Sequence, residues 1–170
     1  ITTIEGNHLF TKKAKGRLQN LKDLLKDENV LGHVGIGHTR WATHGIPSNL
    51  NSHPHTNNDE TISLVHNGII ENYKEIEEQV SKYEFKSETD TERVCALIDS
   101  YYNGDNELEA IEKAIELVKG SYALGVMFEG KDKLYGVKKD APLVLGVGEN
   151  EYFLSSDISA FLAYTKEHIF

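Results

Sequence analysis

Apolar residues recur at helical spacing in four segments of the chain. The pattern is best marked after residue 90, where Val94, Leu97, Ile98 and Tyr101 fall at i, i+3, i+4 and i+7. The preceding segment, residues 87–92, is rich in side chains that accept hydrogen bonds from the free N–H groups of a helix start. Each stripe predicts an amphipathic helix with one face on a core. The four expected helices are residues 15–27, 72–83, about 90–103 and 107–119.

Short apolar runs of the kind found in β-strands lie between and after these helices. They comprise residues 33–38, 61–66, 122–128, 133–137, 143–147 and 152–154. The last four runs follow one another closely, and the link of residues 129–132 is too short for a parallel crossover, so we expect antiparallel pairing there. Helices grouped in the middle of the chain and strands clustered late favour an α+β fold.

The composition is that of one folded domain. The chain has 170 residues, of which 39% are hydrophobic and 26% charged, and these values exclude a disordered or fibrous chain. The formal net charge is -9, and the one basic cluster, residues 12–17, is too short to bind a phosphate backbone or an anionic lipid surface. We therefore expect neither nucleic acid nor a membrane as a partner.

The sequence also bears on the cellular compartment. No stretch approaches the roughly 18 consecutive apolar residues of a membrane-spanning helix. The first residues, ITTIEGNHLF, lack the basic and apolar regions of a signal peptide. The single cysteine, Cys95, forbids an intrachain disulfide and suits a reducing compartment. These features predict a cytoplasmic protein.

Six of the eight histidines lie between positions 33 and 66. A metal site is the first hypothesis, since histidine is the commonest metal ligand and His53 and His55 are two residues apart. The HxHxDH pattern of binuclear zinc hydrolases fails, because Asn57 and Asn58 stand where Asp and His are required. The sequence also has no HExxH motif and no cysteine pair. We therefore expect no metal and no other cofactor, and histidines that form hydrogen bonds.

Several polar residues each have a structural and a functional interpretation. Asn67-Gly68 between apolar runs signals a two-residue hairpin turn, the better interpretation of the pair by itself, whereas a carboxamide and a glycine N–H also suit an oxyanion hole. Arg40 is either a surface cation or a fork for a carboxylate. Asp90 is either a helix N-cap or a partner for an ammonium. With the Thr43 hydroxyl, they describe a pocket for an amino acid whose side-chain carbonyl is attacked, and glutamine fits that description.

Several motifs resemble those of one enzyme family. The first half of the chain carries GIGHTRWATHG at residues 35–45, NSHPH at 51–55, VHNGIIEN at 65–72 and SETDTE at 87–92. The second half carries GSYALGVMF at 120–128, APLVLG at 141–146 and FLSSDISA, expected to include a final helix, at 153–160. Together they resemble the class II glutamine amidotransferase domain of the glutamine–fructose-6-phosphate amidotransferases. The resemblance covers essentially the whole chain.

The resemblance implies the αββα sandwich of the N-terminal nucleophile hydrolases, with two antiparallel sheets between helical layers. It also implies that an N-terminal cysteine, with its own α-amine as base, attacks the side-chain amide of L-glutamine and releases ammonia. The ammonia then reaches a sugar isomerase domain, outside this chain, and converts fructose 6-phosphate into glucosamine 6-phosphate. The full-length protein is expected to be a homodimer.

The resemblance assigns substrate-binding roles by position. Arg40 is expected to bind the substrate carboxylate with help from Thr43 and His44. Asp90 is expected to hold the α-ammonium group.

It also assigns residues to the chemistry and to the rim of the pocket. Asn67 and Gly68 are expected to form the oxyanion hole. Trp41 resembles a residue that guards the ammonia passage, where the structural alternative is a core or rim aromatic. His53 falls near the pocket, where the alternative is a hydrogen-bonded scaffold.

The nucleophile of the family is missing from the sequence. Ile1 has no nucleophilic side chain, and in the family the cysteine and the segment after it lie upstream of this position. Cys95, beside Val94 on the apolar side of its helix, is expected to pack in the core. Residues 1–170 are thus expected to be an N-terminally incomplete type 2 glutamine amidotransferase domain, inactive by itself. The alternatives are a glutamine-binding or regulatory module without a nucleophile and, less favoured, a metal-dependent hydrolase.

Overall fold

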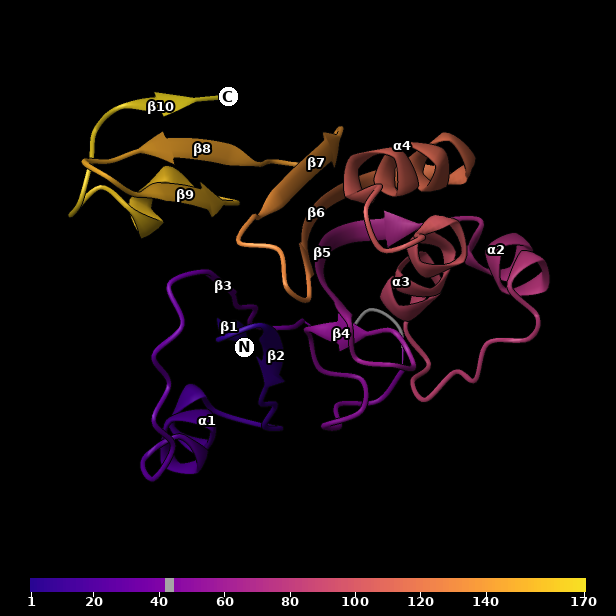
Figure 1. Ribbon diagram of the computed structural model, residues 1–170, viewed down its shortest axis with the longest axis horizontal. Helices are drawn as coiled ribbons and strands as arrows, with labels where there is room; N and C mark the ends of the chain where they lie inside the picture. The colour runs from indigo at the N-terminus through magenta and orange to yellow at the C-terminus, as the bar shows by residue number, and fades with distance from the viewer. Residues whose placement is uncertain (42–44) are drawn as a thin grey trace.

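The computed structural model of the chain describes residues 1–41 and 45–170 (Figure 1). Its helices are α1 (Leu18–Leu24), α2 (Tyr73–Gln79), α3 (Asp90–Tyr101), α4 (Glu107–Leu117) and the 3₁₀ helix η1 (Ile158–Ala160). The first strands are β1 (Thr2–Glu5), β2 (His8–Thr11), β3 (Gly35–Ile36), β4 (His55–Thr56) and β5 (Ile62–Ile70). The later strands are β6 (Gly120–Phe128), β7 (Tyr135–Lys139), β8 (Val144–Val147), β9 (Tyr152–Ser155) and β10 (His168–Ile169).

A four-stranded antiparallel sheet in the order β4-β5-β6-β7 is the centre of the fold. Its two long strands, β5 and β6, pair over their whole length, from Ile62 opposite Phe128 to Ile70 opposite Gly120. Side chains alternate between the two faces of a strand, so each face of this sheet has its own set of apolar residues.

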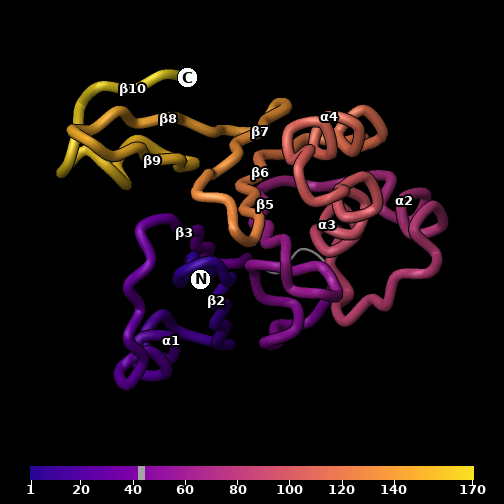
Figure 2. Tube along the Cα trace, in the orientation of Figure 1, coloured from indigo at the N-terminus to yellow at the C-terminus, as the bar shows by residue number. Residues whose placement is uncertain are grey.

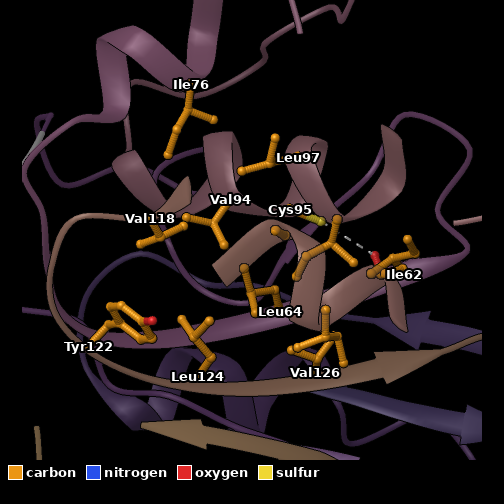
Figure 3. Close-up of a cluster of buried hydrophobic side chains, with 14 of the residues drawn as sticks. Ile62, Leu64, Ile76, Val94, Cys95, Leu97, Val118, Tyr122, Leu124 and Val126 are labelled. Atoms are coloured by element: carbon orange, nitrogen blue, oxygen red, sulfur yellow. Dashed lines mark hydrogen bonds between the residues drawn. The ribbon is translucent and has the colours of Figure 1, made fainter. Parts of the chain in front are cut away.

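One face of the central sheet packs against the helices. Leu64 and Leu124 lie in one cluster with Val94 and Leu97 of α3, and all four side chains are at most 1% exposed (Figure 3). Cys95 belongs to the same cluster, and its Sγ lies 4.0 Å from the carbonyl oxygen of Ile62 (Figure 3). The expectation that this cysteine packs in the core is confirmed.

The opposite face of the central sheet carries a second, smaller sheet in the order β2-β1-β3. Ile4 of β1 and Ile36 of β3 form a core cluster with Met127 of β6. A hydrogen bond of 2.8 Å between the hydroxyl oxygens of Thr2 and Ser63 also joins the two sheets. A layer of helices thus covers one sheet, which packs on another, and the α+β fold class is confirmed.

The last three strands form a third sheet, in the order β10-β8-β9. It lies beside β7 and away from α2 and α3, as the yellow end of the trace shows (Figure 2). The expected antiparallel pairing is confirmed for β6 with β7 and for β8 with β9. The final helix expected within residues 153–160 is only the single turn η1.

Local patterns mispredict three features near the N-terminus. The stripe at residues 15–27 does form α1, yet α1 buries none of its residues, and Leu18 and Leu24 are 57% and 52% exposed. The expected strand at 33–38 is reduced to β3. The hairpin of β1 and β2 has no predicted counterpart, because its strands are only four residues long. In the described part of the chain, no helix is long and apolar enough to cross a membrane.

Candidate active site

A cavity of about 180 Å³ lies between the segment after β3, the strand β5 and the start of α3. It adjoins a wider cavity of about 440 Å³ that shares part of its lining. Thr43 and His44 lie outside the described residues. The other six residues expected at the site all line the smaller cavity: Arg40, Trp41, His53, Asn67, Gly68 and Asp90.

Asn67 and Gly68 lie inside β5, opposite Ala123 and Tyr122 of β6, so the hairpin-turn interpretation is wrong. The strand continues through the pair because β6 provides a partner along its full length. Gly68 has φ 127°, and a Cβ at this position would lie 2.0 Å from the carbonyl oxygen of Ser121. Only glycine therefore fits here.

Backbone N–H groups of β5 point alternately to its two edges. The N–H of His66 donates to Nδ1 of His53 over 3.3 Å, and the N–H of Ile70 donates to Oδ2 of Asp90 over 2.9 Å. Both bonds lie on the edge of β5 that faces away from β6. The period of two places the N–H of Gly68 between them on the same edge, where Gly68 lines the cavity.

Asp90 is the first residue of α3, and its carboxylate is buried. The helix N-cap is Thr89, whose hydroxyl accepts a 3.3 Å hydrogen bond from the N–H of Glu92. The N-cap interpretation of Asp90 is therefore wrong. Its side chain instead accepts from Ile70 of β5 and lies with Oδ1 3.9 Å from Nδ1 of His66.

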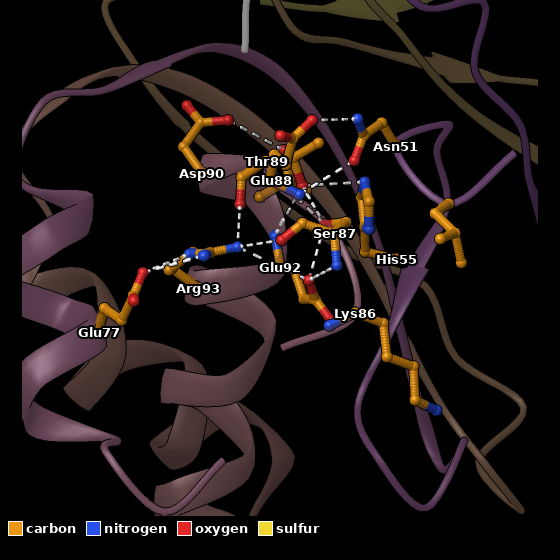
Figure 4. Close-up of polar contacts among 12 residues, drawn as sticks. Asn51, His55, Glu77, Lys86, Ser87, Glu88, Thr89, Asp90, Glu92 and Arg93 are labelled. Carbon is orange, nitrogen blue, oxygen red and sulfur yellow. Dashed lines mark hydrogen bonds and ion pairs between the residues drawn. The ribbon is translucent and has the colours of Figure 1, made fainter. Parts of the chain in front are cut away.

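The loop before Asp90 is held by two charged residues of the first helical turn (Figure 4). Glu92 accepts hydrogen bonds from the backbone N–H and the hydroxyl of Ser87, at 2.7 and 2.6 Å. Arg93 donates to the carbonyl oxygens of Ser87 and Thr89 and to the carboxylate of Glu77. These bonds fix the entry into α3 and so the position of Asp90.

Arg40 and Trp41 come from the segment that follows β3. The Arg40 guanidinium lines the cavity and donates a 3.3 Å hydrogen bond to the carbonyl oxygen of Gly45. Trp41 is 89% exposed at the edge of both cavities, which excludes the core interpretation of this side chain and leaves a position on the rim.

Three histidine rings pack together at the cavity, where His53 and His55 are buried and His38 is partly buried. His38 stacks on His53 with ring centroids 4.3 Å apart, and His53 meets His55 edge-on at 5.0 Å. Burial lowers the pKa of His53 strongly and that of His55 to about 3. In the described residues no group of three or more histidines, cysteines or carboxylates is arranged to hold a metal ion.

These neutral histidines predict acid sensitivity. In the unfolded chain a histidine binds a proton below a pH of about 6.5, whereas buried His53 and His55 stay neutral. The unfolded state then binds more protons, so the free energy of unfolding falls as the pH drops below 6.5, by about 1.4 kcal/mol per pH unit for each histidine. Urea unfolding between pH 7 and pH 5 measures this slope.

A matched pair of variants isolates the contribution of one ring. His55→Gln keeps a polar group near Thr89 and should reduce the slope by about 1.4 kcal/mol per pH unit. His168→Gln, at an exposed position, should leave it unchanged. Equal slopes in the unsubstituted chain and His55→Gln would contradict the assignment.

Sequence reasoning missed five residues that line the cavity, namely His38, Thr39, His66, Thr89 and Thr91. For four of them the signal is a neighbour in the sequence: Thr39 precedes Arg40, His66 precedes Asn67, and Thr89 and Thr91 flank Asp90. His38 is two residues before Arg40, and its place against Asn67 follows only from the packing of β3 beside β5 and β6.

Several known enzymes are similar to this chain in sequence. Glutamine–fructose-6-phosphate aminotransferase (isomerizing) of Clostridium perfringens is 52% identical over 170 residues, which cover 98% of this chain and 28% of the relative. The enzyme of the same name from Clostridium tetani is 55% identical, with the same coverage, and that of Thermococcus kodakarensis is 45% identical over 174 residues, 100% of this chain and 29% of the relative. The chain thus spans less than a third of these relatives.

Two solved structures share the fold. Glutamine phosphoribosylpyrophosphate amidotransferase from B. subtilis, complexed with ADP and GMP, superposes with a TM-score of 0.80 at 22% identity, over 96% of this chain and 37% of that one. A structure described as the allosteric regulatory enzyme of purine biosynthesis gives 0.78 at 23% identity with the same coverage. These superpositions show that the chain has the same fold as the two enzymes, in agreement with the expected fold class.

The family itself follows from a match over most of the sequence. The model of the glutamine amidotransferase domain family matches residues 38–163, which include the segment after β3, β5 and the start of α3. The resemblance in the motifs is therefore confirmed, and the chain belongs to the glutamine amidotransferase domain family.

Proposed function

We propose that the chain is the glutaminase part of an amidotransferase that hydrolyses the side-chain amide of L-glutamine and delivers ammonia to fructose 6-phosphate, forming glucosamine 6-phosphate. Relatives 43–55% identical to this chain are named glutamine–fructose-6-phosphate aminotransferase (isomerizing), which supports this function. Residues 1–170 act as one domain in this proposal. The sugar isomerase domain lies in the part of a longer, cytoplasmic, homodimeric protein that the chain does not span.

The cavity offers complementary groups for both ends of glutamine. Arg40 binds the α-carboxylate through its planar guanidinium, assisted by Thr43 and His44. The buried carboxylate of Asp90 binds the α-ammonium, while its Oδ2 keeps the bond to the N–H of Ile70. Trp41 covers the outer rim, next to the wider cavity through which ammonia leaves.

The observation that carries the proposal is a pair of donors on one strand of the same cavity. The Nδ2 amino group of Asn67 donates no hydrogen bond to any residue that the structure describes, and the N–H of Gly68 points to the cavity edge. Two such donors stabilise the negative oxygen that forms when the amide carbonyl is attacked.

The attacking thiolate comes from outside residues 1–170. The one cysteine of the chain, Cys95, is fully buried in the core, and burial raises the pKa of its thiol. In the proposed reaction an N-terminal cysteine gives its proton to its own α-amine and its sulfur bonds to the amide carbon. The tetrahedral intermediate expels ammonia, which takes that proton, and water hydrolyses the thioester to glutamate.

A chimera tests this function. Residues 1–170 replace the matching segment of the Clostridium perfringens relative, which supplies the remaining parts. We expect the chimera to release ammonia from glutamine, whereas the 170-residue chain alone shows no turnover and no labelling of Cys95 by a glutamine-like electrophile. Turnover by the chain alone would overturn the assignment of the nucleophile. An inactive but folded chimera that binds glutamine would favour the binding or regulatory module.

The proposed oxyanion hole also predicts how much kcat should fall when one of its donors is removed. In the chimera, Asn67→Ala removes one of two donors and should lower kcat for glutamine hydrolysis by about 10²- to 10³-fold. The KM for glutamine should change little, since the amide oxygen carries full charge only in the transition state. Asn106→Ala, at a polar position outside the cavity, serves as the control. An unchanged kcat in Asn67→Ala would remove Asn67 from the chemistry.

A further inference from the structure

A carboxamide presents two chemically opposite ends of nearly the same shape. The Nδ2 end of Asn67 donates hydrogen bonds and the Oδ1 end accepts them. An oxyanion is stabilised only by the Nδ2 end, and an amide turned by 180° would place a partially negative oxygen beside it. A site that uses Asn67 as a donor therefore needs a residue that sets the orientation of this side chain.

His38 makes the contact that distinguishes the two ends. Its Nε2 lies 2.6 Å from Oδ1 of Asn67. Because an amide oxygen only accepts, Nε2 must carry the proton and donate it. With the proton on Nε2, the turned amide would bring N–H groups against this N–H, so this tautomer selects the orientation in which Nδ2 is available to the cavity.

The His38 ring is itself fixed from the strand that carries Asn67. It stacks on His53 at an interplanar angle of 20°, and Nδ1 of His53 accepts the backbone N–H of His66. His66 is the residue before Asn67 on β5. Strand β5 therefore positions both groups. Oδ1 belongs to Asn67, and the His38 ring that carries Nε2 packs on His53, which the N–H of His66 holds.

We propose that His38 is a positioning residue, which holds the carboxamide of Asn67 with its amino group toward the developing oxyanion. The inference rests on the proposed function, because it assigns a cause to the geometry of that oxyanion hole. His38 acts through Asn67 and does not touch the substrate in this role. Loss of its donor leaves Asn67 free to turn and reduces the fraction of productive sites.

The first test needs no catalysis. In the ¹⁵N-labelled 170-residue chain at pH 7, NMR of the imidazole nitrogens should show the His38 proton on Nε2, together with one well-ordered pair of Asn67 amide protons. In His38→Phe, which keeps a flat ring against His53, the Asn67 pair should broaden or shift toward solvent-like values. A proton only on Nδ1, or an Asn67 pair unchanged in His38→Phe, would overturn the inference.

The second test separates positioning from general damage. In the chimera, His38→Phe should lower kcat about 10- to 100-fold with the KM for glutamine within about threefold, as for a misplaced catalytic group. His38→Gln, which places an amide N–H near the position of Nε2, should restore most of kcat, whereas His38→Asn, whose amide ends near Nδ1, should not. Equal kcat in the Phe and Gln variants would contradict the proposal. A chimera inactive with His38 in place refutes the proposed function, while the NMR result still decides the orientation of Asn67.

Discussion

Replacing Gly68 with alanine is expected to lower the free energy of unfolding by about 3–5 kcal/mol, since left-handed backbone and an overpacked contact are each costly for a residue with a Cβ. Gly68 has φ 127°, and the added carbon would lie 2.0 Å from the carbonyl oxygen of Ser121 on the paired strand. Relief of this overlap requires β5 and β6 to separate at the site. Urea unfolding of the 170-residue chain measures the loss.

Gly130 provides the matched control for Gly68. It also has a positive φ, 69°, but a Cβ built on it meets no heavy atom within 4 Å. Gly130→Ala should therefore cost only about 1 kcal/mol, the strain of the left-handed conformation. Similar losses in the two variants would show that the clash with Ser121 is relieved without cost, and that β5 tolerates a side chain at position 68.

The same pair of residues shows where local sequence rules end. Asn67-Gly68 is the usual signal for a hairpin turn, yet β5 passes through it because nine consecutive pairs with β6 outweigh the preference of two residues. The strands β5 and β6 themselves, by contrast, were indicated by the short apolar runs at residues 61–66 and 122–128.

The sequence was enough to predict which residues form the site, but it was not enough to predict how they are arranged in space. The motifs bring Arg40, Asn67 and Asp90 to attention, but their meeting depends on how β3 and α3 pack against opposite faces of one sheet. The contact of His38 with Asn67 joins residues 29 positions apart, and no spacing rule in one sequence encodes it. Helix α1 shows a different limit of sequence rules. Its apolar spacing correctly predicts a helix, but the spacing does not say whether another surface covers the apolar side chains, and α1 buries none of them.

Asp90→Asn is expected to weaken glutamine binding about 30- to 1000-fold, which corresponds to about 2–4 kcal/mol for losing one partner of a buried charge pair. The carboxamide keeps an oxygen for the N–H of Ile70, so the loop and α3 should stay in place. The variant therefore removes the charge and little else. Isothermal titration calorimetry of the 170-residue chain with L-glutamine measures the effect, with Asp99→Asn, a half-buried carboxylate later on the same helix, as the control.

A second ligand identifies the group that Asp90 recognises. 4-Carbamoylbutanoate is glutamine without its α-amino group, so it should bind the unsubstituted chain far more weakly than glutamine does. If Asp90 binds the ammonium, Asp90→Asn should lose this discrimination and bind the two compounds with similar affinity, because the variant removes the only interaction in which they differ. If Asp90→Asn weakens both ligands equally and keeps their ratio, the carboxylate serves the fold of the α3 entry and the ammonium is bound elsewhere.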